Sequence, residues 1–127
     1  MRRPTILVAE PEPSDALSTR KLVLETAKFN VLTAHSNAEA IEFFQAFPNV
    51  DAVVVAEGDE ISCGEVGSFI AAISNKTPII GLSARQGFFC RSAQHQLSSH
   101  DPEGLVQLLR SMFGDPRDID QEQSKLR

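Results

Sequence analysis

Residues 51–56 read Asp51-Ala52-Val53-Val54-Val55-Ala56. A continuous apolar run of this length is typical of a strand that is buried on both faces of a parallel sheet. Ligands and reacting groups of open parallel sheets lie at the carboxyl ends of the strands. This strand ends on Ala56, whose methyl group is neither a nucleophile nor a metal ligand. The sequence therefore indicates a fold that has the place of a functional site but lacks a reactive side chain there.

Outward from this run, short apolar segments alternate with helical patterns. Pro11 and Pro13 end the first strand, and Asp101 followed by Pro102 is a helix-start signal. On the first helix, Arg20 is expected among the charged residues of the exposed side. The expected elements are strand 5–9, a helix from Ser14 or Asp15 to about Lys28, strand 30–34, helix 36–47, strand 52–55, a helix from about Gly64 or Glu65 to Ser74, strand 77–82, a short fourth helix, a weak strand 96–98 and helix 102–113.

Length and composition limit the class of protein. The 127 residues suffice for one domain, with 42% hydrophobic residues and a net charge of -5. We expect a domain over residues 1–114 and a polar, disordered tail or linker over 115–127. The acidic charge argues against nucleic-acid binding, and no apolar run is long enough to be a signal peptide or to cross a membrane, so a cytoplasmic protein is expected. Cys63 and Cys90 lack metal-site spacing and are expected to be free thiols.

The segments 6–13, 51–56, 78–84 and 101–105, in this order, resemble a response-regulator receiver domain, and the resemblance covers roughly residues 4–114. It implies a single doubly wound, five-stranded parallel sheet of the flavodoxin-like, CheY-like (βα)5 type. Ser99 follows Ser83 by sixteen positions, about a turn or two fewer than the family has there. The fourth helix is therefore expected to be short, tilted or replaced by a loop.

The resemblance also implies which positions once carried chemistry. The family's acidic pair, which holds magnesium, falls on Glu10 and Pro11, and its phosphoacceptor aspartate falls on Ala56. Its hydroxyl on the fourth strand is matched by Ser83, and its lysine on the fifth strand falls on Ser99. The site has lost its nucleophile, one metal carboxylate and its cation, so no metal or other cofactor is expected.

Two nearby acids are candidate surrogates for the missing aspartate. Glu57 follows Ala56 directly, but neighbours on a strand point to opposite faces. Asp59 lies on the following loop and is the better candidate. A conventional receiver that uses one of these acids with Glu10 is the first alternative function. A flavodoxin-like small-molecule-binding protein is the second, although no glycine-rich phosphate loop follows the first strand.

The resemblance implies that partners dock on the fourth helix, the fifth strand and the helix 102–113. Phe88, Phe89 and Gln96 fall in this region and are the candidate partner-binding residues, and Gln96 replaces the family's switch aromatic. The sequence leaves open whether the two phenylalanines are exposed anchors or core residues.

The expected function is a non-enzymatic, phosphorylation-independent interaction module in bacterial two-component or phosphorelay signalling. Its expected partner is a signalling protein or effector, or a second copy of the chain.

Overall fold

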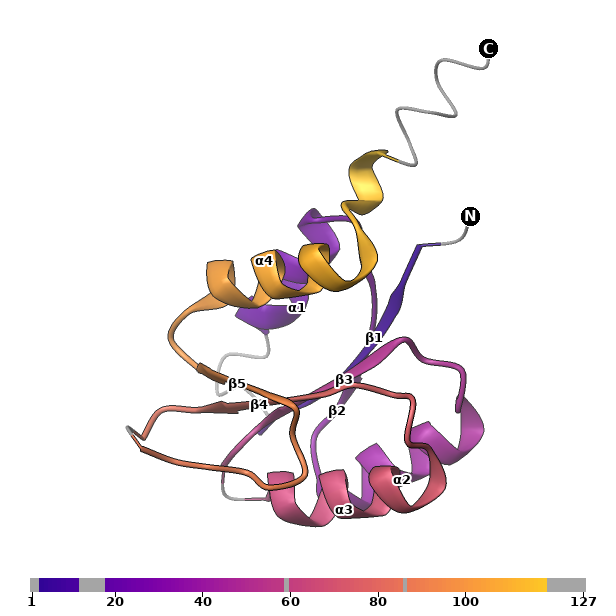
Figure 1. The fold of residues 1–127 in the computed structure, drawn as a ribbon, viewed down its shortest axis with the longest axis vertical. Helices are drawn as coiled ribbons and strands as arrows, with labels where there is room; N and C mark the ends of the chain where they lie inside the picture. The colour runs from indigo at the N-terminus through magenta and orange to yellow at the C-terminus, as the bar shows by residue number, and fades with distance from the viewer. Residues whose placement is uncertain (1–2, 12–17, 59, 86, 119–127) are drawn as a thin grey trace.

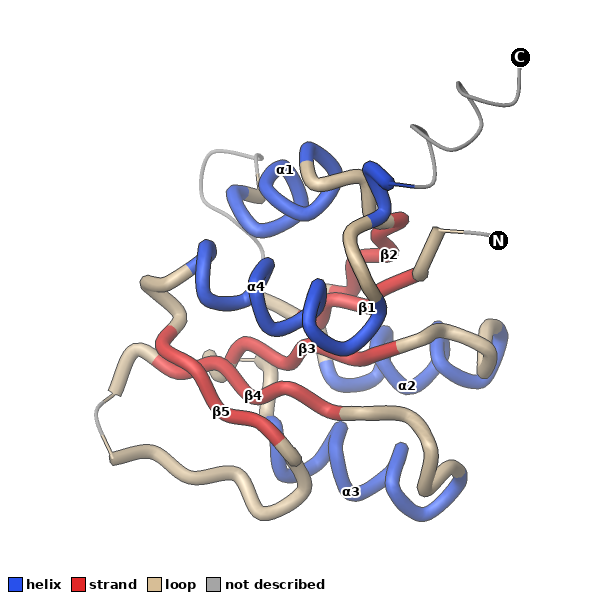
Figure 2. The backbone as a smooth tube through the Cα atoms, turned by 45° about the horizontal axis from the view of Figure 1, so that its top comes forward, coloured by secondary structure: helices blue, strands red, loops and turns tan. Residues whose placement is uncertain are grey.

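The computed structural model describes residues 3–11, 18–58, 60–85 and 87–118. These residues form a single parallel sheet of five strands with helices on both faces, which confirms the predicted fold class. The strands are β1 (Thr5–Ala9), β2 (Asn30–Ala34), β3 (Ala52–Ala56), β4 (Ile79–Ser83) and β5 (His95–Ser98), and the helices are α1 (Thr19–Thr26), α2 (Asn37–Ala46), α3 (Cys63–Ile73) and α4 (Pro102–Phe113). The strand order is β2-β1-β3-β4-β5, with α1 and α4 on one face and α2 and α3 on the other (Figures 1 and 2).

Strand β3 is central, and all of its residues are buried. Val53 and Val55 belong to the hydrophobic cluster under α2 and α3, whereas Val54 and Ala56 belong to the cluster under α1 and α4. Because side chains alternate along a strand, a continuous apolar run supplies both cores at once. This explains why the sequence of residues 51–56 predicts a strand buried on both faces so clearly.

Local signals set most of the helix ends. Ser36 caps α2 by accepting a hydrogen bond from the Glu39 amide at 3.1 Å. Asp101 caps α4, whose first residue is Pro102. Helix α1 begins only at Thr19, with Ser18 as its N-cap, whereas the expected caps Ser14 and Asp15 lie outside the described residues.

The connection between β4 and β5 contains no helix in its described parts, residues 84–85 and 87–94. The sequence predicts a fourth helix that is short, tilted or replaced by a loop, and the structure has the loop. The Cys90 amide and carbonyl bond to the side chain of Gln96, at 3.0 and 2.7 Å, so they do not enter a helical ladder. Gly87 has a φ of 78°, a left-handed conformation that also departs from a right-handed helix.

The prediction of free thiols is wrong, because Cys63 and Cys90 form a disulfide. Cys63 is the first residue of α3, and Cys90 lies on the loop that replaces the fourth helix. The parallel crossover brings them together although they are 27 residues apart in sequence. Spacing rules detect local motifs and give no signal for such a pair.

At the C-terminal end, Gly114 ends α4 with a φ of 82°. Residues 116–118 then form a helical turn, and residues 119–127 lie outside the described part of the chain, so the predicted disordered tail stays a prediction. Within the described residues, none of the helices has the length and apolar character needed to cross a membrane.

Candidate functional site

The carboxyl ends of the strands meet at one edge of the sheet, as the fold requires. Backbone hydrogen bonds continue the ladders just beyond the strands. The Glu10 amide donates to Ala34 O at 2.9 Å, the Glu57 amide to Leu82 O at 2.9 Å, and the Ser99 amide to Ser83 O at 3.0 Å. The structure therefore gathers Glu10, Ala56, Ser83 and Ser99 along this edge.

The carboxylate of Glu10 is already occupied by partners from the same chain. Its side chain is buried, at 2% exposure, yet it accepts a hydrogen bond and ion pair from Arg20 Nη1 at 2.7 Å. Its other oxygen accepts from the hydroxyl of Ser18. A buried carboxylate requires such compensation, and here a guanidinium supplies the positive charge that a metal ion would otherwise supply.

This arrangement corrects the expected place of Arg20. Its side chain is only 25% exposed and reaches from α1 back to the end of β1, instead of lying on the solvent face. Neither Arg20 nor Ser18 was a predicted site residue. The spacing of Ser18 and Arg20 at the start of a helix gives no sequence signal for this, because the contact depends on how α1 lies against the end of β1.

Pro11 closes the neighbouring space. A Cβ atom built on Gly58 would collide with Cγ of the Pro11 ring, so the proline lies directly against the backbone that follows β3. The resemblance assigns the second acidic residue to this position, and the proline ring supplies no ligand atom.

Ala56 and Glu57 point to opposite faces, as the strand alternation predicts. Ala56 is 2% exposed and packs in the cluster under α1 and α4. Glu57 instead accepts a hydrogen bond from the Cys63 amide at 2.7 Å and so binds the N-terminal end of α3. Its carboxylate is engaged away from the alanine. Asp59, the other candidate surrogate, lies outside the described residues.

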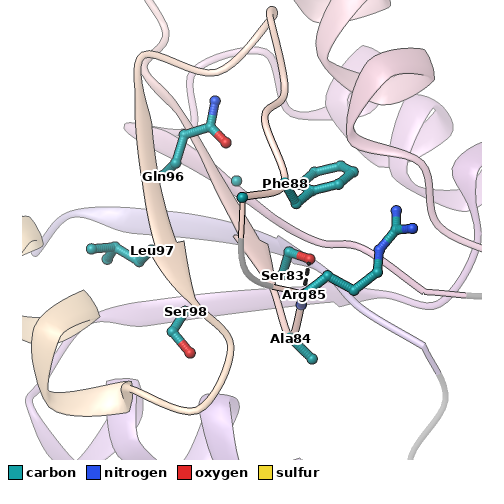
Figure 3. A pocket seen from close by; sticks show the side chains of 9 residues that line it. Ser83, Ala84, Arg85, Phe88, Gln96, Leu97 and Ser98 are labelled. Carbon is teal, nitrogen blue, oxygen red and sulfur yellow. Dashed lines mark hydrogen bonds between the residues drawn. The ribbon is translucent and has the colours of Figure 1, made fainter.

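Ser83 and Ser99 complete the edge. The hydroxyl of Ser83 accepts from the Arg85 amide at 3.1 Å, which is a turn contact (Figure 3). Ser99 has a short neutral side chain in place of the family's lysine. Ser99 therefore supplies no positive charge at the end of β5.

The described residues at this edge do not fit a magnesium ion. Magnesium needs octahedral oxygen ligation, and it is usually held by one or two free carboxylates with water. Glu10 is paired with Arg20, and Pro11 and Ala56 carry no side-chain oxygen. Across residues 3–11, 18–58, 60–85 and 87–118, no three His, Cys, Asp or Glu side chains cluster as a metal site would require.

The two phenylalanines of the β4–β5 connection have different environments. Phe88 is half-buried against the core under α2 and α3, and its ring centroid lies 5.3 Å from the Arg85 guanidinium carbon. Phe89 is 70% exposed. The structure thus separates them into one packing residue and one exposed aromatic.

A shallow groove of about 240 Å³ lies between this connection and β5. Its lining includes Ser83, Arg85, Phe88 and Gln96. Figure 3 shows Gln96 and Leu97 on opposite sides of β5, as strand geometry requires. Gln96 is occupied by its two bonds to Cys90, so it has a structural role.

Comparison with solved structures finds the same fold in response-regulator receiver domains. A receiver domain protein from Clostridium thermocellum aligns with a TM-score of 0.71 at 22% identity, over 85% of this chain and 92% of that one. A response regulator from Thermotoga maritima, in complex with Mg²⁺ and BeF, aligns with a TM-score of 0.71 at 24% identity, over 87% and 99%. CheY from the CheX–CheY–BeF₃–Mg²⁺ complex of Borrelia burgdorferi aligns with a TM-score of 0.73 at 18% identity, over 87% and 89%.

No protein-family model matches the chain, and no curated protein matches it by sequence. At these identities the structural likeness establishes the receiver-type fold.

Proposed function

We propose that this chain is a receiver-like protein-interaction module of two-component or phosphorelay signalling that works without phosphorylation. The observation that carries the proposal is the ion pair between Glu10 and Arg20. The last carboxylate of the acidic pair is neutralised inside the protein, so it is not available to hold a metal ion. Two of the similar structures were solved with Mg²⁺ and a beryllium fluoride, whereas the matching strand ends here carry Pro11, Ala56 and Ser99.

The missing groups are the ones that phosphoryl transfer needs. A carboxylate nucleophile attacks, a divalent ion neutralises the incoming charge, and a cation binds the transferred group. Ala56 replaces the first, the pairing of Glu10 removes the second, and Ser99 replaces the third. The output of the domain is then binding, and the chain is not an enzyme.

The binding face that we propose consists of residues 87–94, β5 and α4, and we call it the docking face. Its exposed anchor is Phe89, since a large aromatic that is 70% exposed is free to enter a partner's pocket. The partner is a signalling protein or effector. Nothing in the described residues favours the flavodoxin-like alternative.

The direct test is treatment with acetyl phosphate and magnesium chloride, followed by intact-mass spectrometry. We expect no phosphoryl adduct, while a conventional receiver treated in parallel becomes modified. An adduct on this chain would contradict the proposal. Its loss in Asp59→Asn would then identify that residue as the surrogate acid, and its loss in Glu57→Gln would identify the other.

Calorimetry with magnesium chloride tests the metal side separately. Wild-type protein should show no binding tighter than about millimolar, because one paired carboxylate is not an octahedral site. A restored variant carrying Pro11→Asp, Ala56→Asp, Ser99→Lys and Arg20→Gln should bind magnesium. Tight binding by the wild type would contradict the assignment of Glu10 to Arg20.

A further inference from the structure

The disulfide lies directly over β4. The Cα atoms of Cys63 and Cys90 are 6.1 Å apart, which is within the range that a disulfide bridges without backbone movement. Beneath it is Gly81, where an added Cβ would come within 3.3 Å of Cys63 Sγ and 3.6 Å of Cys90 Cβ. Because Gly81 has no side chain, there is room for the disulfide against β4. The disulfide therefore holds the loop close to the sheet.

Besides the disulfide, residues 87–94 are attached at Cys90, at Ser92 and at Gln94, whose amide donates to Ile79 O at 3.0 Å and whose side-chain oxygen accepts from the Ile79 amide at 2.6 Å. Gln96 holds the Cys90 backbone, and the hydroxyls of Ser92 and Ser68 lie 3.1 Å apart. Ser92 also packs so closely on Gly67 of α3 that a Cβ there would collide with it. Residues 87–94 belong to no helix or strand, and the disulfide is their covalent link to α3, in addition to the contact of Ser92 with Ser68 and the bonds of Gln94 with Ile79.

From this arrangement we infer that Cys63 and Cys90 form a thiol–disulfide switch for residues 87–94. The oxidised pair holds these residues on α3 and β4, and reduction by a dithiol releases them while the sheet stays folded. Exposed Phe89 is next to Cys90, so release would disperse the docking face. That last consequence rests on the proposed function, whereas the switch itself does not.

The exchange balances with a dithiol as the reductant. One thiolate of the reductant attacks Cys90 Sγ, the S–S bond breaks, and Cys63 leaves as a thiolate that takes a proton from solvent. The second thiol of the reductant resolves the mixed disulfide and frees Cys90, which is protonated in turn. The two electrons come from the reductant, which becomes a disulfide.

Burial determines how this reaction begins. Cys63 is 0% exposed and Cys90 is 4% exposed, so a reductant reaches the bond only after residues 87–94 open locally. Cys90 is the sulfur attacked because it lies on the segment that opens. Cytosolic reductants keep most thiols reduced, and disulfides that form there are usually transient or sensing ones, which is the behaviour expected of a switch.

Hydrogen exchange followed by mass spectrometry tests the inference on wild-type protein, oxidised or treated with dithiothreitol. Alkylation of free thiols verifies each state. On reduction, amides of residues 87–94, including those of Cys90 and Ala93, should exchange at least about 10-fold faster. Amides of β1 and β3 should stay better protected than those of residues 87–94, which shows that the domain is still folded. The variant Cys63→Ala/Cys90→Ala should match reduced wild type with and without dithiothreitol.

Three results would overturn the switch: unchanged exchange of residues 87–94 after reduction, loss of protection across β1 and β3 at the same time, or resistance of the bond to dithiothreitol. The last two would make the disulfide a staple of the whole domain. None of these readouts involves a partner or a phosphoryl group, so the outcome is independent of the proposed function.

Discussion

At the scale of single residues, Arg20 is the group that makes the buried carboxylate of Glu10 tolerable. In Arg20→Gln that carboxylate keeps, among the described residues, the hydroxyl of Ser18 as its side-chain partner. We expect a loss of about 2 kcal/mol or more in the free energy of unfolding, below the full cost for a buried pair because the guanidinium is partly exposed. Urea unfolding measures it.

The matched control is Lys21→Gln on the exposed side of the same helix, which should stay within about 0.5 kcal/mol of wild type. The double variant Glu10→Gln/Arg20→Gln should recover part of the loss, since it removes the unpaired charge. Equal midpoints for Arg20→Gln and Lys21→Gln would contradict the role of the ion pair.

Phe88 and Phe89 form a second matched pair at this scale. Phe88→Ala should cost about 2 kcal/mol, less than truncation of a fully buried phenylalanine, because its ring is half-buried. Phe89→Ala should leave stability within about 0.5 kcal/mol, while weakening partner binding by about 2 kcal/mol if the docking face is correctly proposed. Thermal melts and a binding assay on both variants separate these effects. Equal loss of stability in both would show that the loop packs otherwise.

At the scale of elements, the side chain of Gln96 on β5 hydrogen-bonds the backbone of the loop at Cys90, as a neighbouring strand would. Gln96→Ala removes both hydrogen bonds to Cys90 and takes away the partner of the buried Cys90 amide, while the Cys90 carbonyl keeps the hydrogen bond from the Ala93 amide at 3.1 Å. We expect a loss of about 1 to 3 kcal/mol, measured by urea unfolding of the oxidised protein. The control Ser98→Ala, on the same strand but exposed, should change stability by less than about 0.5 kcal/mol. Similar, small losses of stability in Gln96→Ala and Ser98→Ala would contradict this role of Gln96.

The end of α4 has a pH-dependent contact. The side-chain hydrogen bond from Arg117 is the main cause that lowers the pKa of Asp115 from 3.8 to about 2, and Arg110 contributes charge. Because the folded-state pKa is depressed, the stabilisation is fully present above pH 3.8 and is lost as the pH falls through about 2.

Carboxyl-carbon NMR of Asp115 should therefore titrate with a midpoint near 2. Arg117→Gln should move that midpoint back toward 3.8, since it deletes the principal hydrogen bond. A wild-type midpoint already at the ordinary value would show that the contact does not persist in solution.

At the scale of the whole molecule, the disulfide links positions 27 residues apart. Closing a loop of that length should add about 3 kcal/mol to the free energy of unfolding, chiefly by restricting the unfolded chain. Urea midpoints of oxidised and reduced wild type measure the difference, and Cys63→Ala/Cys90→Ala should be insensitive to dithiothreitol. Identical midpoints for the two wild-type states would mean that the bond does not form.

Local signals in the sequence determined the order of strands and helices and the fold class. The apolar run of β3, the cap at Ser36 and the Asp101–Pro102 start of α4 act over a few residues, so their effect is readable without the rest of the chain. The identities of Pro11, Ala56 and Ser99 are also matters of sequence, and they carry the case against a phosphorylation site.

The tertiary structure alone decided which residues meet across those elements. The pairing of Glu10 with Arg20, the bond from Cys63 to Cys90 and the separation of Phe88 from Phe89 depend on crossovers and on the loop in place of the fourth helix. The physical reason is that hydrophobic periodicity and capping act along the chain, whereas burial, ion pairs and disulfides depend on distances through space that local patterns do not encode.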